Sequence, residues 1–210
     1  VDVAKDALQE KVIYEWPKNL DLPGYRDHSQ PVPQSIRDAA ALIAQSLRPV
    51  LYVGGGILKA RAAEVLMELA ELIGTPVVTT LMARGAFPDN HPLCLGMPGM
   101  HGNATAITAM QKSDLLINLG ARFDDRITGK VSTFAPGAKI IHVDIDPAEQ
   151  GKVRRPDVPI VGDCRLVIEE LVKTIREMLA SGDAQADISD WKSRVSGWQE
   201  QFPLYYPPNE

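Results

Sequence analysis

Residues 48–56 read RPVLYVGGG, and this stretch decides the fold. Its apolar part, Val50–Val53, shows no alternation with polar residues, which is typical of a strand buried on both faces of a parallel sheet. Three glycines follow at once, and a helical pattern comes after them. The stretch therefore predicts a strand, a tight turn and a helix, which together make the first unit of an α/β fold.

Short apolar runs of the same kind recur along the chain, separated by segments of helical periodicity. The predicted strands are Val50–Val53, Pro76–Thr79, Leu93–Leu95, Leu115–Leu119, Ile140–Val143 and Val158–Val161. The predicted helices cover residues 34–47, 59–73, 102–111 and 164–180. Helices between buried strands force parallel crossovers, so we expect a doubly wound, Rossmann-like α/β domain with a parallel sheet of about six strands.

Composition argues against several classes of function. The 210 residues carry a formal net charge of −5 and no cluster of Lys or Arg, so a nucleic-acid partner is disfavoured. No stretch approaches the roughly 20 apolar residues that span a bilayer, so no membrane segment is expected. Cys94 and Cys164 lie far apart without clustered His, which predicts two reduced, buried thiols and no metal site.

The two ends of the chain differ from its middle, residues 34–180, which we expect to form the α/β domain. Residues 1–33 hold closely spaced prolines and are expected to form a linker over the surface of a domain. Residues 181–210 begin with a small, polar stretch and continue into a predicted helix at 190–200, with Trp191, Val195 and Trp198 on one face. Whether the tryptophans pack on this domain or on a surface outside it stays open.

The loops that follow the strands carry the candidate site, because ligands of an open parallel sheet bind outside the carboxyl ends of its strands. Residues 54–56 follow the first strand, where their backbone N–H groups can approach a phosphate at a helix N-terminus. A plain NAD-binding unit is disfavoured, because Lys59 stands at the third glycine position and no acidic residue ends the second strand. A tight turn without a ligand is the alternative.

Residues 95–102, with the sequence LGMPGMHG, form a second candidate loop. Glycines at this density permit close approach of the backbone to a flat ligand, and methionine side chains adapt to rings. His101 is either a ligand contact or a structural hydrogen-bonding residue, and the neighbouring glycines favour the contact.

Charged residues follow three more strands. Residues 120–126 read GARFDDR, in which the arginines either pair with the aspartates or bind a phosphate or carboxylate through a bidentate guanidinium. Asp144 and Asp163 follow the next two strands, where each is either a helix N-cap or an acceptor for ribose or ribityl hydroxyls. Because all these features fall on one edge of the sheet, they indicate a nucleotide-binding site.

Taken together, the motifs resemble the large subunit of the acetohydroxyacid (acetolactate) synthase family of thiamine-diphosphate enzymes. The resemblance runs from Val1 to about Ile175. It is carried by RPVLYVGGG at 48–56, TTLM at 79–82, GMPGMHG at 96–102, GARFDDRITGK at 120–130 and HVDIDP at 142–147. The combination is specific, since other thiamine enzymes share the fold but neither the FDDR run nor GMHG.

The resemblance implies the central one of three α/β domains, with Val1–Asp6 as the last strand of the first domain and residues 191–210 leading into the third. It also implies a mainly structural FAD across the strand ends. Arg126 would hold the carboxylate of a second 2-keto acid, with Met100 and His101 lining its approach. The implied FAD contacts are Gly55, Thr80, Leu81, Gly99, Met100, His101, Gly120, Ala121, Arg122, Asp124, Asp144, Ile145, Asp163 and Cys164.

Thiamine diphosphate and Mg²⁺ are implied for the intact enzyme and assigned to the missing domains. Their motif begins Gly-Asp-Gly and ends near paired Asn, whereas here Gly162-Asp163 is followed by Cys164 and the next Asn is Asn209. We therefore expect no catalytic residue in this stretch and no activity of the isolated chain.

The family also implies a homo-oligomer, a small regulatory subunit, and a cytoplasmic location in bacteria or a plastid or mitochondrial one in eukaryotes. Two other classes of function use a similar sheet. A stand-alone flavin- or nucleotide-binding module of an electron-transfer protein remains the alternative. A sirtuin-type deacylase is disfavoured, because two distant cysteines cannot supply its zinc module.

Overall fold

The computed structural model describes residues 2–16, 30–183 and 185–203. Six parallel strands form one sheet in the order β3-β2-β1-β4-β5-β6. The predicted α/β fold with about six parallel strands is confirmed, and each strand end lies within one residue of its predicted position. The strands are β1 (Pro49–Val53), β2 (Val77–Thr79), β3 (Cys94–Gly96), β4 (Leu115–Leu119), β5 (Lys139–Asp144) and β6 (Val158–Val161).

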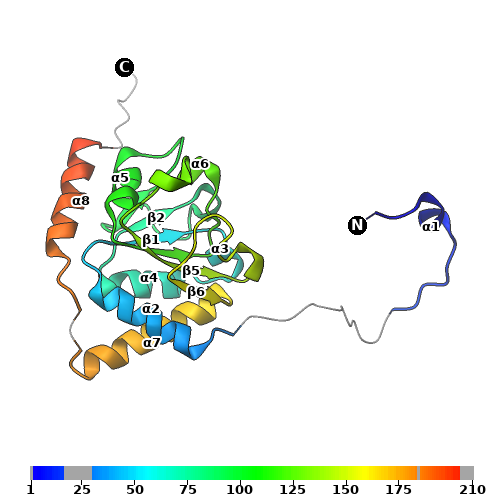
Figure 1. Cartoon of the computed structure of the whole chain (residues 1–210), viewed down its shortest axis with the longest axis horizontal. Helices are drawn as coiled ribbons and strands as arrows, with labels where there is room; N and C mark the ends of the chain where they lie inside the picture. The colour runs from blue at the N-terminus through cyan, green and yellow to red at the C-terminus, as the bar shows by residue number, and fades with distance from the viewer. Residues whose placement is uncertain (1, 17–29, 184, 204–210) are drawn as a thin grey trace, which may run out of the picture.

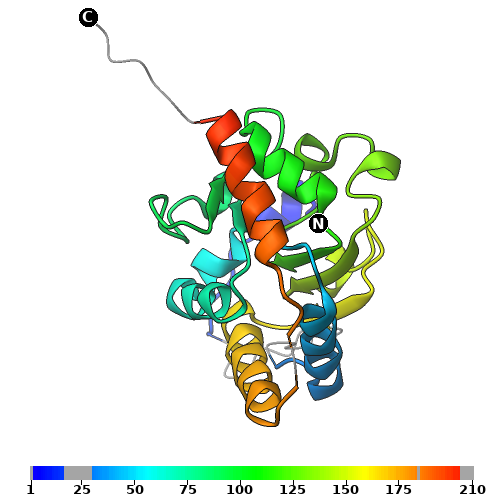
Figure 2. The ribbon, with the colours of Figure 1, turned by 90° about the vertical axis from the view of Figure 1, so that its left-hand side faces the viewer.

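Helices cover both faces of the sheet (Figure 1). One face carries α2 (Pro33–Gln45), α4 (Ala63–Ile73) and α7 (Cys164–Ala180), and the other carries α5 (Ala104–Lys112) and α8 (Ser189–Gln201). Figure 2 shows α8 running alongside α5. The short elements are α1 (Lys5–Gln9), α3 (Gly56–Lys59), α6 (Asp125–Thr128), η1 (Leu81–Ala83), η2 (Val131–Thr133) and η3 (Pro147–Glu149).

The core fills both faces of the central strands. Every residue of β1 and β4 is buried, which accounts for the mainly apolar sequences of both strands. Leu51 and Val53 point to the α2, α4 and α7 side, whereas Val50 and Tyr52 point to the α5 and α8 side.

Three predicted helices have bounds that differ from the structure by two residues or more, and the one at 102–111 lies at Ala104–Lys112. The single helix at 59–73 is wrong, because α3 and α4 are separated by Arg61, whose φ of 52° is incompatible with a continuous right-handed helix. The helix at 34–47 ends at Gln45 instead. There the Asp114 carboxylate accepts the N–H groups of Leu47 and Arg48, each at 2.9 Å, and draws the chain out of the helix.

The tail helix packs on this domain, which settles the alternative left open for its tryptophans. Trp191 is only 2% exposed and donates a 3.0 Å hydrogen bond to the Pro49 carbonyl. Trp198 lies edge-to-face against Trp191, with 5.6 Å between ring centroids, and Val195 is buried beside them. The predicted common face of the three side chains is therefore confirmed.

The described part of the N-terminal segment lies away from the sheet (Figure 1). Residues Lys5–Gln9 form the helix α1, and every residue from 2 to 16 is exposed, with α1 standing apart from the sheet (Figure 1). A strand needs a neighbour for its backbone groups, and residues 2–6 have none in the described part of the chain. The strand implied for Val1–Asp6 and the surface linker would belong to a neighbouring domain, so both stay predictions, and the prolines between 17 and 29 lie outside the described residues.

Three further observations bear on function. No helix in the described ranges has the length and apolarity needed to cross a membrane. Within the same ranges, no three His, Cys, Asp or Glu side chains are grouped to hold a metal ion. Both cysteines are free and buried, as predicted.

Candidate functional site

The candidate site lies along the carboxyl edge of the sheet. β1 pairs with β2 on one side and with β4 on the other. The chain leaves β1 through α3 and α4 on one face and enters β4 from α5 on the opposite face. The crossovers therefore diverge between β1 and β4, which is the switch point where doubly wound sheets bind ligands.

The glycine run after β1 packs directly against the turn after β4. The Gly54 N–H donates to the last carbonyl of β4 and the Gly56 N–H donates to the Gly120 carbonyl, both at 3.0 Å. A Cβ on Gly54 would overlap with the Gly120 carbonyl and Ala121 Cα, and a Cβ on Gly56 would lie 2.8 Å from Gly120 Cα. The N–H groups of Gly54 and Gly56 are thus used inside a tight turn. Of the three glycines, Gly55 is the one whose N–H group is left for the predicted phosphate contact.

Large apolar side chains lie exposed along this edge. Leu81 is 70% exposed, Met82 and Met100 are each 75% exposed, and Ile145 is 56% exposed. They come from the loops after β2, β3 and β5. Several exposed apolar side chains at a sheet's ligand edge are typical of a surface that binds a flat apolar group.

Two loops bring Met100 and His101 next to the α6 turn that carries Arg126. The Met100 N–H donates to the Arg126 carbonyl at 3.1 Å. Gly99 has a φ of 94°, and a Cβ there would lie 2.8 Å from the same carbonyl, so this approach requires glycine. The side chains of Met100, His101 and Arg126 are exposed. The three predicted substrate contacts therefore belong to one group.

Three aspartates end strands or begin helices along the same edge. Asp124, Asp144 and Asp163 each accept, at 2.9 Å, the N–H of the residue two positions on. Asp163 is the N-cap of α7, so the capping interpretation is correct for it, whereas the residue that caps η3 is Asp146 and not Asp144. Asp124 caps α6, which the sequence did not predict. All three use Oδ1, and Oδ2 has no hydrogen-bond donor among the described residues, which leaves one carboxylate oxygen per residue for hydroxyl groups.

The arginines of the GARFDDR run do not pair with its aspartates. Arg122 and Arg126 are exposed, and within residues 30–183 no carboxylate lies at ion-pair distance from either guanidinium. The pairing alternative is therefore wrong, and both guanidinium groups remain free for an anion.

Comparison with known proteins identifies the fold family. The family model described as the central domain of thiamine pyrophosphate enzymes matches residues 36–171. The chain belongs to this family. Its sheet is therefore that of a thiamine pyrophosphate enzyme central domain.

Three relatives of this central domain are acetolactate synthases by name. An acetolactate synthase of Mycobacterium avium is 57% identical over 208 residues, which are 99% of this chain and 33% of that protein. The acetolactate synthase large subunit of Corynebacterium glutamicum is 52% identical over 98% of the chain and 32% of that protein. A probable large subunit from Methanocaldococcus jannaschii is 48% identical over 83% of the chain and 30% of that protein. The chain thus spans about a third of the length of the curated relatives it matches.

Two of the FAD contacts implied by the resemblance are buried below the carboxyl edge. Ala121 is 4% exposed and Cys164 is 5% exposed. Burial raises the pKa of the Cys164 thiol to about 12, and Asp163 and Asp144 add to this effect. The thiol therefore stays protonated at neutral pH, and it packs against Gly120 rather than serving as a nucleophile.

Sequence reasoning missed one residue that shapes the edge. Arg84 donates a 2.8 Å hydrogen bond from Nη1 to the buried Thr79 hydroxyl and pairs with Asp89 through Nη2. These bonds tie down the turn that presents Leu81 and Met82. No motif pointed to Arg84, because its partner in the strand is an ordinary threonine.

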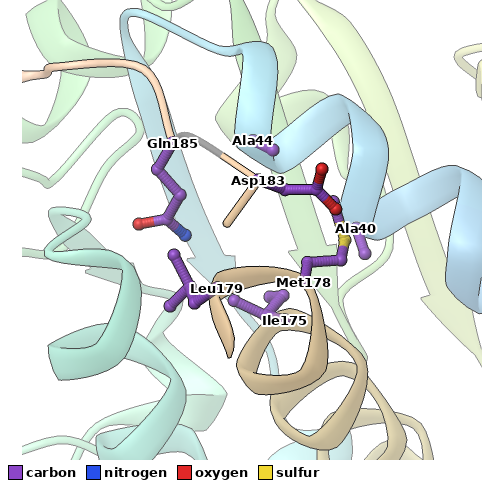
Figure 3. A pocket seen from close by; sticks show the side chains of 7 residues that line it. All are labelled: Ala40, Ala44, Ile175, Met178, Leu179, Asp183 and Gln185. Atoms are coloured by element: carbon purple, nitrogen blue, oxygen red, sulfur yellow. The ribbon is translucent and has the colours of Figure 1, made fainter. Parts of the chain in front are cut away.

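One enclosed pocket among the described residues lies away from the carboxyl edge. It is lined by α2, α7 and the segment after α7, and Figure 3 shows its side chains closing on one another. Its volume of about 10 Å³ is room for about one water molecule. The lining residues are Ala40, Ala44, Ile175, Met178, Leu179, Asp183 and Gln185.

Proposed function

We propose that this chain is the FAD-anchoring central domain of an acetolactate synthase catalytic subunit. The intact enzyme would condense pyruvate with a second 2-keto acid in branched-chain amino-acid biosynthesis. The observation that carries the proposal is the composition of the carboxyl edge. Exposed apolar side chains lie there together with unpaired arginines and with aspartates that each have one carboxylate oxygen without a hydrogen-bond donor among the described residues. A relative that aligns with 99% of the chain is named acetolactate synthase, which supports the assignment to that enzyme.

The edge suits FAD because it offers a partner for each part of that molecule. Leu81, Met100 and Ile145 present apolar surface for a flat ring. Arg122 presents an unpaired guanidinium for the diphosphate, and Asp144 has a free carboxylate oxygen for a hydroxyl. The same set of side chains suits a plain nicotinamide dinucleotide poorly, because the third glycine and the acidic end of β2 are missing.

Thiamine diphosphate and Mg²⁺ do not fit the described residues of this chain. Asp163 is bound to the first turn of α7 as its N-cap, and no group of metal-ligating side chains occurs in the described ranges. The proposal therefore assigns both to the other domains of the intact protein and derives no step through them here.

The residues of this chain bind and orient rather than react. FAD, when bound, supplies a flat structural scaffold and no net redox chemistry in the main reaction. Arg126 would hold the carboxylate of the second 2-keto acid, and the side chains of Met100 and His101 would line its approach and exclude water. The group formed by these three residues is exposed, as a surface that meets another domain must be.

The domain limits and partners form part of the same proposal. Residues 34–180 would be the central domain, residues 1–33 would lead in from the preceding domain, and residues 181–210 would lead to the next one. The helix α8 packs on the central domain before the chain continues. The intact subunit would form a homo-oligomer and bind a small regulatory subunit.

An activity assay with two proteins tests the proposal. The isolated 210-residue chain should form no acetolactate with thiamine diphosphate, Mg²⁺ and FAD added, because it lacks the residues that bind the first two. The parent chain with all its domains should form acetolactate from pyruvate in the colorimetric acetoin assay. Turnover by the isolated chain above a no-protein control, or none by the parent, would contradict it. Tight, reversibly reducible FAD in the isolated chain would instead favour a stand-alone flavin module.

A further inference from the structure

Three buried polar side chains form a row across the central strands. Tyr52 of β1 is paired in register with Asn118 of β4, which is paired with His142 of β5. Tyr52 and Asn118 are fully buried, and His142 is 1% exposed. The row lies on the sheet face covered by α5 and α8. We refer to these residues as the polar row.

The hydrogen bonds of the polar row converge on two neighbouring peptide carbonyls. Asn118 binds Ala121 twice, donating from Nδ2 to its carbonyl at 2.7 Å and accepting its N–H on Oδ1 at 3.0 Å. His142 Nε2 lies 3.1 Å from the same carbonyl. The Tyr52 hydroxyl donates to the Arg122 carbonyl at 3.2 Å. Side chains from three strands therefore hold one short loop.

Packing of the sheet does not require polar side chains at the positions of the polar row. The row two positions earlier on the same face, formed by Val50, Leu116 and Ile140, is apolar and buried. A buried polar group without a partner is destabilising, whereas an apolar side chain of the same shape carries no such risk. The row next to the loop is polar instead, and among the described residues the side chain of each member bonds to that loop.

The loop alternates between buried and exposed side chains. Phe123 is 5% exposed, and its ring centroid lies 6.0 Å from that of Tyr52 and 5.3 Å from that of His142. Arg122, between the bound carbonyl of Ala121 and the buried ring of Phe123, is therefore directed outward. Its own carbonyl is held by Tyr52.

The protonation of His142 agrees with this role. A carbonyl oxygen only accepts, so Nε2 carries the proton that points at Ala121. Burial lowers the pKa of His142, against the opposing effects of Asp144 and Glu149, so the ring is neutral at neutral pH. Its Nδ1 is buried and has no hydrogen-bond partner among the described residues. The contact with the Ala121 carbonyl is therefore the hydrogen bond that the ring nitrogens make within the described chain.

We propose that Tyr52, Asn118 and His142 are positioning residues that preorganise the Ala121–Phe123 loop, so that Arg122 is held ready for the anionic part of the cofactor. The inference rests on the proposed function, because it takes Arg122 as a cofactor contact. It adds three residues that never touch the ligand and act only through the loop backbone.

The test is a flavin-fluorescence titration of the parent protein with FAD. Tyr52→Phe removes one hydroxyl and keeps the ring, and it should weaken FAD binding about three- to tenfold. His142→Leu should weaken binding to a similar extent, whereas His142→Gln, which keeps a donor, should restore most of the affinity. Trp191→Phe serves as the matched control, because it removes a buried hydrogen bond on the same face but far from the loop. It should leave FAD affinity unchanged.

Two readouts separate positioning from a general loss of stability. The effect of Tyr52→Phe should vanish in an Arg122→Ala background, since the loop then has no guanidinium to position. Amide exchange of residues 121–123 without FAD should be faster in Tyr52→Phe than in wild type and unchanged in Trp191→Phe. Equal FAD affinity of wild type, Tyr52→Phe and His142→Leu, or additive effects with Arg122→Ala, would overturn the inference while the proposed function stands. Absence of FAD binding by the wild-type parent would overturn the proposed function and this inference with it.

Discussion

The Gly54→Ala substitution should destabilise the domain by about 3 kcal/mol or more, since a methyl group forced against packed backbone cannot be relieved by a side-chain rotation. The added Cβ would overlap with the Gly120 carbonyl, Ala121 Cα and Ala121 Cβ. These atoms belong to the turn after β4, which is itself held by the polar row. Urea unfolding, followed by tryptophan fluorescence, measures the loss.

Two other glycines provide controls for this prediction. Gly137→Ala should unfold like wild type, because a Cβ there meets no atom within 4 Å. Gly55→Ala should also fold, because its nearest neighbour would be Met82 Cβ at 3.4 Å, an ordinary contact. A Gly54→Ala protein as stable as Gly137→Ala would show that the two turns are not packed as described.

Arg122→Ala and Asp144→Ala should each weaken FAD binding in the parent protein by about ten- to a hundredfold. Each removes one charge-assisted hydrogen bond, which is worth about 1.5–3 kcal/mol. Arg122 has an unpaired guanidinium at the switch point, and Asp144 has a free carboxylate oxygen at the end of β5. The measurement is a flavin-fluorescence titration with the parent protein, because neighbouring domains would complete the flavin surface.

Matched variants at the far end of α7 control for loss of charge. Arg176→Ala removes an exposed guanidinium that pairs with Glu68, and Asp183→Ala removes an exposed carboxylate beyond the helix end. Both lie away from the carboxyl edge and should bind FAD like wild type. Unchanged affinity in both Arg122→Ala and Asp144→Ala would place the cofactor site elsewhere.

The sheet could be predicted because local and tertiary preferences agree along its strands. Val50–Val53 and Leu115–Leu119 are mainly apolar runs, with Asn118 as a polar residue in the second, and both are fully buried central strands. The capping role of Asp163 was also visible, since it directly precedes a long helical pattern. The motifs after the strands placed the candidate residues on one edge because parallel strands end together.

Other features depend on contacts that no local pattern reports. The end of α2 is set by Asp114, which lies 66 residues or more from the N–H groups it accepts. The docking of Trp191 depends on a carbonyl at the start of β1. In the sequence, the members of the polar row are single polar residues within otherwise apolar strands. Their partners are the backbone carbonyls of Ala121 and Arg122, which only the folded structure brings next to them.

The central claim, that the carboxyl edge of this domain anchors a flavin dinucleotide, is tested most directly by competition between FAD and NAD for the parent protein. The account predicts that the fluorescence of FAD is quenched when it binds and that excess NAD does not displace it. The reason is that the third glycine and the acidic residue at the end of β2, which a nicotinamide dinucleotide needs, are missing. Displacement of FAD by NAD, or tighter binding of NAD than of FAD, would contradict the account.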